Sequence, residues 1–215
     1  MVGLRHVKKI LIAAVAFGLA GCEMPAGGLA SIAVPAQREA FVAAGTMRFT
    51  APSGYCVDKE ATSSRADGGF VLFGSCAALN PLRSLSWPAQ PVALAAMVKG
   101  TGPETPLHNS FPALETFFRS EAGRAALSRS GQSDSVDILT VRGEGDILLI
   151  QLRDTSPSAD SAIAQVYWRA LASAGGRMVS LSALPRAEYK IDDAAQIALL
   201  LDFVGRIEDL RKKPQ

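Results

Sequence analysis

The chain has 215 residues, of which 48% are hydrophobic and 20% are charged, and its formal net charge is +2. Once a short leader is set aside, this length suits one globular domain that buries about 70% of its unfolded surface. Because basic and acidic residues nearly balance, there is no electrostatic case for nucleic-acid binding.

The first 21 residues have the layout of a secretory signal peptide. Arg5, Lys8 and Lys9 form a positive segment, and an uncharged run follows from Ile10 to Ala20. A spanning helix needs roughly 20 apolar residues, so this run is too short to cross a bilayer and fits the apolar core of a signal peptide. No later apolar run is long enough to supply a transmembrane helix.

The end of this segment reads Leu19-Ala20-Gly21-Cys22. The tetrapeptide resembles the lipobox of bacterial lipoproteins. That resemblance implies a diacylglyceryl group on the Cys22 sulfur, cleavage after Gly21 and acylation of the new amino terminus, typically with palmitate. The alternative is an ordinary signal peptide that is followed by an unrelated cysteine.

The resemblance also implies where the protein resides. Two or three acyl chains on Cys22 would make attachment to a membrane effectively permanent. In Gram-negative lipoproteins an Asp after the cysteine favours the inner membrane, and here the residue is Glu23. We therefore expect an exported, membrane-anchored protein that faces the periplasm, with the outer membrane favoured over the inner.

Cleavage would change the charge and define the domain. It removes three of the 22 basic residues, which leaves 19 basic residues against 20 acidic ones and a net charge near −1. Residues 22–45 are rich in Ala, Gly and Pro, and we interpret them as a lipidated tether. Residues 36–44 within it are compatible with a short helix. The globular domain is then expected over residues 46–215.

With Cys22 lipidated, Cys56 and Cys76 remain, and in an oxidising compartment a disulfide is the default. Their midpoint lies in the turn-rich stretch 63–69, between segments with strand character at 55–57 and 70–76. We therefore predict a bridged antiparallel hairpin. The alternative, a redox pair, lacks the Cys-x-x-Cys spacing.

The first half of the domain contains strands and one long helix. Met47–Thr50 reads as a short strand, and the apolar run from Val92 to Lys99 as another. Ser110 is a plausible N-cap for a helix from Phe111 to about Arg129, with Gly131 as its stop. The apolar stripe of this helix comprises Phe111, Leu114, Phe118, Ala122 and Ala125, widened by Phe117.

The second half continues with strands at 137–142 and 147–152, the latter apolar on both faces and therefore covered on both sides. Segments 163–173 and 177–184 flank Gly175-Gly176, which predicts a hairpin. Asp192 is a candidate cap for a last helix whose stripe comprises Ile197, Leu200, Leu201, Val204, Ile207 and Leu210. Arg211, Lys212 and Lys213 are expected at its carboxyl end.

These elements predict an α+β fold in a single domain, with a mostly antiparallel sheet and two main helices packed on it. The opening segment 49–55, the late strand 176–181 and the closing apolar helix resemble the α+β sandwich of PsbP/Mog1-like proteins. The predicted disulfide hairpin and the long middle helix depart from that pattern. Proteins of this group differ in role, so the resemblance implies a fold and no activity.

No arrangement of residues typical of catalysis is apparent in the sequence. His108 is the only histidine after residue 21 and lies in a Pro-rich loop, where a solvated or capping role is expected. One histidine and no free cysteine do not fit the usual zinc sites, and we expect no metal and no cofactor. Gly143 to Asp146, with Asp137 and Asp154 nearby, is more typical of a solvated hairpin than of a calcium loop.

One polar surface is a candidate binding site. Gln165, Tyr167 and Arg169 alternate onto one face of a strand, and Gln151 and Arg153 share a face of the preceding strand. If the two faces coincide, they form a polar patch with Trp168 on the opposite side. Tyr and Arg are common anchors in interfaces, although an ordinary exposed sheet face is the simpler interpretation.

We therefore expect a lipid-anchored envelope protein that acts as a non-catalytic accessory or binding module. Its expected partners are the membrane, through the lipid on Cys22, and an envelope protein. The alternatives are a small periplasmic enzyme that uses carboxylates or His108, a small-ligand-binding protein, and a purely structural role in the envelope.

Overall fold

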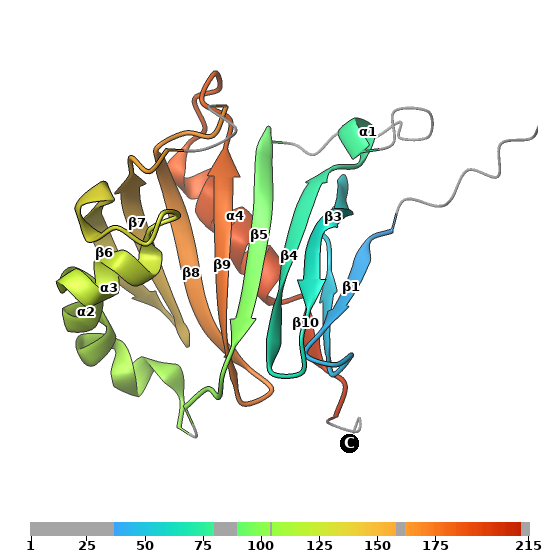
Figure 1. Ribbon diagram of the computed structural model, residues 1–215, viewed down its shortest axis with the longest axis horizontal. Helices are drawn as coiled ribbons and strands as arrows, with labels where there is room; N and C mark the ends of the chain where they lie inside the picture. The colour runs from blue at the N-terminus through green and yellow to red at the C-terminus, as the bar shows by residue number, and fades with distance from the viewer. Residues whose placement is uncertain (1–36, 80–89, 104, 158–161, 212–215) are drawn as a thin grey trace, which may run out of the picture. The chain divides into compact units, whose positions relative to one another are not determined.

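A seven-stranded antiparallel sheet forms the centre of the computed structural model, which describes residues 37–79, 90–103, 105–157 and 162–211 (Figure 1). Residues 34–215 form one compact unit. The predicted signal peptide and Cys22 lie outside the described residues. Across the sheet the strands are β3 (Tyr55–Ser64), β4 (Gly68–Ser75), β5 (Val92–Lys99), β9 (Arg177–Pro185), β8 (Val166–Ala174), β7 (Ile147–Asp154) and β6 (Val136–Glu144).

The remaining elements pack around this sheet. A small antiparallel sheet contains β1 (Glu39–Val42), β2 (Met47–Thr50) and β10 (Ile207–Asp209). The helices are α1 (Cys76–Leu79), α2 (Phe111–Arg119), α3 (Glu121–Leu127) and α4 (Asp193–Val204), with short 3₁₀ turns at Leu107–Ser110 and Ser133–Ser135. The α+β class and the single antiparallel-sheet domain are thus confirmed.

Two hydrophobic cores lie on opposite faces of the large sheet. Leu149 on β7 points into the core that α4 and the small sheet cover, where Phe203 packs edge-on against Phe73 with ring centroids 5.1 Å apart. The neighbouring Leu148 and Ile150 point into the second core, beneath α2 and α3. Successive side chains on a strand alternate between faces. The prediction that this strand is covered on both sides is therefore confirmed.

The helices α2 and α3 cover only part of their face. In Figure 1 they lie in front of β6 and β7, whereas the same face of β4 and β5 has no helix over it. Met97 on β5 is accordingly 49% exposed although its neighbours Ala96 and Val98 are buried. An apolar stretch of sheet is thus left open beside α3.

Both predicted hairpins form. Gly175 and Gly176 connect β8 to β9 with φ of 59° and 68°, the left-handed conformation that glycine adopts without steric cost. Strands β3 and β4 pair across the turn at 65–67, with Cys56 opposite Gly74.

The predicted long helix over 111–129 is wrong: the structure has two helices that are separated at Ser120. The backbone of Ser120 is extended, and its Oγ accepts a hydrogen bond from the Gly123 N–H, 3.2 Å away, which caps α3. Gly123 lies against the end of α2, where a Cβ would come within 1.9 Å of the Phe117 carbonyl oxygen, so the second helix begins at a very close approach of the two backbones.

Two further expectations about helices are wrong. Residues 39–42 form strand β1, in which Ala40 and Val42 are buried and Phe41 is exposed, so the pattern there has period two. The part of the expected tether from Glu39 onward therefore lies in the folded unit. The last helix ends at Val204, and Ile207 pairs with Phe49 of β2, because that strand edge offers backbone partners.

Among the described residues, no helix is both long enough and apolar enough to cross a membrane.

Candidate functional site

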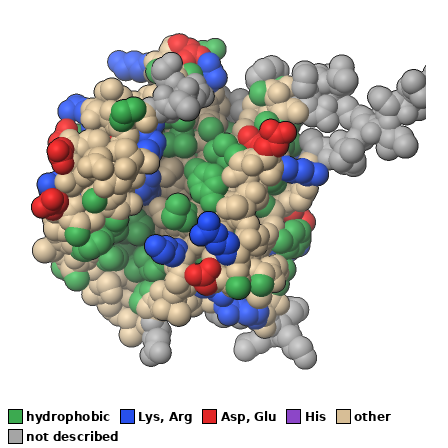
Figure 2. All heavy atoms as spheres, viewed as in Figure 1, with side chains coloured by type: hydrophobic (Ala, Val, Ile, Leu, Met, Phe, Trp, Pro, Cys, Tyr) green, Lys and Arg blue, Asp and Glu red, His purple; other side chains and the backbone are tan. Residues whose placement is uncertain are grey.

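A hollow of about 420 Å³ lies beside α3, over the uncovered part of the large sheet. Its apolar lining includes Phe70 of β4, Ala95 of β5, Leu171 of β8 and Leu184 of β9. Figure 2 shows hydrophobic side chains on the floor of this hollow and basic side chains along its helix side. The hollow therefore combines an apolar body with a charged margin, a composition that is typical of ligand sites.

The predicted polar surface of five residues is divided between the two faces of the sheet. In the register of β7 and β8, Gln151 lies opposite Trp168 and Arg153 lies opposite Val166. Tyr167 and Arg169 lie opposite Leu152 and Ile150 and therefore point to the other face. The two sets of side chains do not coincide, because the pairing register, which is not visible in either strand alone, offsets them by one residue.

Gln151, Arg153 and Gln165 make separate local contacts. The amide nitrogen of Gln151 donates to both carboxylate oxygens of Asp193, at 3.1 and 3.0 Å, at the start of α4. Arg153 lies 3.7 Å from the carboxylate of Asp137 on the adjacent strand, and both side chains are exposed. Gln165 has an exposed side chain, while its carbonyl accepts the N–H of Asp154. None of these contacts belongs to the hollow.

Tyr167 and Arg169, by contrast, lie at the polar margin of the hollow. The side chain of Tyr167 is fully buried, and the guanidinium groups of Arg129 and Arg169 each lie 5.9 Å from the centre of its ring. Cation–π contacts of this kind are attractive. Burial raises the pKa of the Tyr167 hydroxyl, so the group stays neutral at physiological pH.

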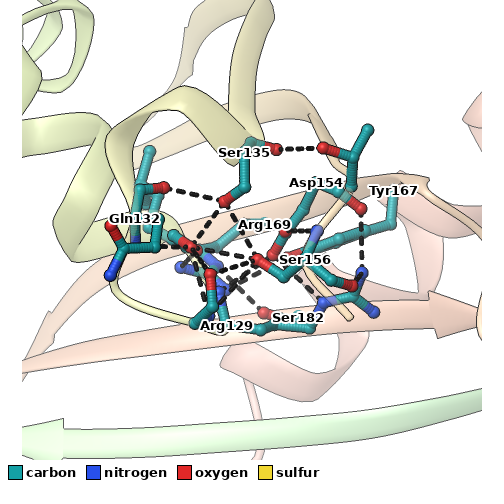
Figure 3. A network of polar contacts seen from close by, with 12 residues as sticks. Arg129, Gln132, Ser135, Asp154, Ser156, Tyr167, Arg169 and Ser182 are labelled. Atoms are coloured by element: carbon teal, nitrogen blue, oxygen red, sulfur yellow. Dashed lines mark hydrogen bonds and ion pairs between the residues drawn. The ribbon is translucent and has the colours of Figure 1, made fainter. Parts of the chain in front are cut away.

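Asp154 is the buried anion of this margin (Figure 3). Its side chain is 0% exposed, and its Oδ2 accepts from the backbone N–H and the Nε of Arg129, at 3.0 and 3.1 Å. Oδ1 accepts from the backbone N–H of Ser156 at 2.9 Å. Burial alone would raise the pKa of this carboxyl, but the hydrogen bonds from Ser156 and Arg129 and the Arg129 charge outweigh it and hold the pKa below its ordinary value.

Four serines extend the network toward the helix side. The hydroxyl of Ser128, which follows α3, lies 2.7 Å from that of Ser135 and 3.1 Å from those of Ser130 and Ser156. Ser156 in turn lies 2.9 Å from both Ser130 and Ser135. These hydroxyl groups satisfy one another and tie the loop after α3 to the end of β7, which holds Arg129 in place.

Arg169 has only neutral acceptors among the described residues. Its Nε donates to the Ser182 hydroxyl at 3.0 Å, and its Nη1 to the Leu127 carbonyl at 3.2 Å. Its Nη2 donates to the Tyr167 hydroxyl at 3.4 Å. Arg129 already holds the carboxylate of Asp154, so two arginines and one aspartate leave one uncompensated positive charge at the margin of the hollow.

Arg129 adds a further unsatisfied donor at the same margin. Its Nη1 is buried and has no hydrogen-bond partner among the described residues. This end of the hollow therefore has more donors than acceptors. Because a buried donor without an acceptor is costly, an acceptor on a ligand would be stabilised here.

The remaining candidates from the sequence lie apart from this network. His108 is exposed, and its Nδ1 lies 3.1 Å from a carboxylate oxygen of Asp146, which also accepts the His108 backbone N–H. Asp137 contacts Arg153, and Asp154 contacts Arg129, so the acids near the 143–146 turn are not gathered in one place. In the described ranges no cluster of three or more His, Cys, Asp or Glu residues could hold a metal ion.

Cys56 and Cys76 lie at disulfide distance, with Cα atoms 4.8 Å apart. Cys76 follows β4 at the start of α1, so the contact closes the open end of the predicted hairpin. This position lies at the end of the β3–β4 hairpin opposite its turn, and neither cysteine lines the hollow.

Sequence reasoning named Tyr167 and Arg169 but missed Arg129 and the serines. Arg129 was assigned to the end of a long helix, and Asp154 was considered only as a possible metal ligand. A local signal did exist for Asp154, since an acid at the end of the apolar run 147–152 needs a buried partner. Its partner lies 25 residues earlier in the chain, where no local pattern points to it.

No family model matches the chain, and no curated protein matches it. Among solved structures it is weakly similar to the Ran-binding protein Mog1p of Saccharomyces cerevisiae, with 12% identity and a TM-score of 0.42, over 80% of this chain and 94% of that one. It is also weakly similar to cyanobacterial PsbP (CyanoP) from Synechocystis, with 12% identity and a TM-score of 0.37, over 86% and 99% of the two chains. The weak likeness to the Mog1 and PsbP folds concerns architecture alone.

Proposed function

We propose that the chain is an exported bacterial lipoprotein, anchored to a membrane through lipid on Cys22, and that its folded domain is a non-catalytic accessory or binding module. The observation that carries the anchor is the Leu19-Ala20-Gly21-Cys22 motif directly after a basic segment and a short apolar run. The proposed location is the periplasmic side of a membrane, with the outer membrane favoured by Glu23.

The cysteine pair supports export. Disulfides persist in oxidising compartments such as the periplasm and are rare in the cytosol. The 4.8 Å separation of the Cys56 and Cys76 Cα atoms is compatible with a bridge of this kind. With Cys22 committed to lipid, the bridge leaves no free thiol in the chain.

The hollow supports a binding role. It is partly enclosed, its floor is apolar, and its margin presents Arg169 beside the Arg129–Asp154 pair. The serine hydroxyls at this margin hydrogen-bond mainly with one another, while His108 contacts Asp146 on a different part of the surface. This arrangement suits ligand or partner recognition better than nucleophilic catalysis, which requires a base beside the nucleophile.

Membrane fractionation tests the anchor. The full chain is expressed in a Gram-negative bacterium beside the variant Cys22→Ala, and both are followed through separation of membranes from soluble periplasm. We expect the unaltered chain in the membrane fraction, favouring the outer membrane, and the variant outside it. Equal distribution of the two chains would overturn the proposed anchor.

Affinity purification from those membranes tests for an envelope protein partner. The same purification from cells that produce the variant Met97→Glu, which places a charge on the rim of the hollow, is the matched comparison. We expect a stoichiometric partner that the variant loses. A partner that binds both chains equally would assign the interaction to another surface.

A further inference from the structure

We infer that the hollow beside α3 binds an amphipathic organic anion, with its negatively charged head at Arg169 and its apolar body along the floor formed by β4, β5, β8 and β9. This inference rests on the proposed binding role and names the chemical class of the ligand.

The charge at the margin determines the sign of the head group. The guanidinium of Arg169 is half-buried and makes no ion pair within the described part of the chain. Burial costs a cation part of its hydration, and an opposite charge at short range offsets that cost. The Asp154 carboxylate forms its ion pair with Arg129, so the charge of Arg169 remains available to an anion.

The geometry of Arg169 leaves donors for that anion. A guanidinium has five N–H groups, and the three bonds to Ser182, Leu127 and Tyr167 use one each from Nε, Nη1 and Nη2. One N–H on each terminal nitrogen is then free of acceptors from the described residues. Two such donors match the two oxygens of a carboxylate or of a similar anion.

Rigid supports hold this arginine in a fixed orientation. Ser182 on β9 is buried and Leu127 ends α3, so the two acceptors come from the sheet floor and from the helix wall. The ring of Tyr167 packs beside the guanidinium. An arginine held on three sides loses little further conformational entropy when it binds an anion.

The rest of the lining determines the body of the ligand. Ala95, Leu171 and Leu184 line the floor, Phe118 and Leu127 form the helix wall, and Met97 lies at the rim. Met97 is 49% exposed, which leaves an apolar surface in contact with water. Covering it with an apolar chain is favourable at roughly 25 cal/mol per Å².

The dimensions favour a small molecule. A hollow of about 420 Å³ lies toward the lower end of the range for small-ligand sites, which is roughly 300 to 1,000 Å³. Ser180 and Ser182 on the floor are the only hydroxyl-bearing side chains that β9 contributes to the described lining, and Ser182 is already engaged by Arg169. The floor therefore offers few polar contacts beyond the charged end.

A series of ligands with one tail and different heads tests the inference. The chain of residues 22–215 with Cys22→Ala is used, because residues 34–215 form one compact unit and an unlipidated chain needs no detergent. Octanoate, octyl sulfate, octanol and octylammonium are titrated while amide NMR shifts are recorded. We expect the two anions to bind at least about tenfold more tightly than octanol and octylammonium, with shifts at Leu171 and Ser182.

Variants separate the charge from the fold. Arg169→Gln should weaken octanoate binding at least about tenfold, whereas Arg153→Gln, an exposed arginine on the opposite face of the sheet, should leave it unchanged. Ala95→Phe fills the floor without touching the polar network and should abolish binding of all four probes. This variant decides the question if Arg169→Gln does not fold.

Several results would overturn the inference: equal affinity for octanol and octanoate, shifts confined to other surfaces, no binding of any probe, or unchanged binding by Ala95→Phe. Such a failure differs from failure of the proposed anchor, since fractionation of the Cys22→Ala variant tests the anchor without any of these ligands.

Discussion

Arg129 and Asp154 form a buried ion pair in which the Nε of Arg129 lies 3.1 Å from Oδ2 of Asp154, while its Nη2 donates to the Asp154 carbonyl at 2.8 Å. The arginine follows α3 and the aspartate ends β7. This pair therefore fastens the helix wall of the hollow to the sheet, and among the described residues Asp154 is the one buried carboxylate at this margin.

Removal of the aspartate should be costly. Asp154→Ala leaves the Arg129 guanidinium largely buried without its counter-charge, and we expect a loss of about 3 kcal/mol in the free energy of unfolding, measured by urea denaturation. The control is Asp137→Ala, which removes an exposed carboxylate 3.7 Å from Arg153 and should cost at most about 0.5 kcal/mol. Equal losses for the two variants would show that the buried pair contributes no more to the free energy of unfolding than the exposed pair does.

The same carboxyl predicts an acid dependence of stability. Its pKa in the folded protein lies below the ordinary value of about 3.9, so the unfolded chain binds the proton more readily. The stabilisation is complete above that unfolded pKa and is lost as the pH falls through the folded pKa. Below about pH 4, the free energy of unfolding of the wild type should therefore decline more steeply than that of Asp154→Asn, and parallel curves would contradict this assignment.

Gly123 should tolerate no side chain. A Cβ there would lie 1.9 Å from the Phe117 carbonyl oxygen and 2.5 Å from the Phe118 Cα, both backbone atoms that cannot rotate away. We expect Gly123→Ala to cost about 3 kcal/mol in the free energy of unfolding. At Gly205 the nearest atom would be 3.5 Å away and φ is −63°, so Gly205→Ala should be neutral or stabilising by about 0.5 kcal/mol. A harmless Gly123→Ala would contradict the close packing of α2 and α3.

The cysteine pair predicts a thiol count. Labelling of the unfolded, non-reduced Cys22→Ala chain should find neither Cys56 nor Cys76 free, and labelling after reduction should find both. Loss of the bridge in Cys56→Ser should lower the free energy of unfolding by about 3 kcal/mol, the value expected for a loop of this size. Two free thiols before reduction would contradict the bridge.

The strands could be predicted because their signals are local. Gly175-Gly176 fixed one hairpin, and the doubly apolar run 147–152 required cover on both faces. The break at Ser120 was missed because the apolar stripe continues through it, and only the packing of Gly123 against Phe117 reveals it. Strand β1 was missed because its two buried residues, Ala40 and Val42, are too few to reveal the two-residue alternation of a strand.

The candidate site was predictable only in part, and the reason is register. Alternation along β8 identified Tyr167 and Arg169 as neighbours on one face. Whether Gln151 joined them depended on its pairing with Trp168, which is a property of two strands. Arg129 and Asp154 are brought together by the return of the chain from α3 through β6 to the end of β7, which no pattern in either segment specifies.

The mass of the mature chain, isolated from bacterial membranes and analysed by mass spectrometry, shows whether Cys22 carries lipid. A lipid-anchored binding module predicts that the chain begins at Cys22 and carries a diacylglyceryl group on its sulfur and an acyl group on its amino terminus. A chain that retains residues 1–21, or one that presents Cys22 as a free thiol, would contradict that account.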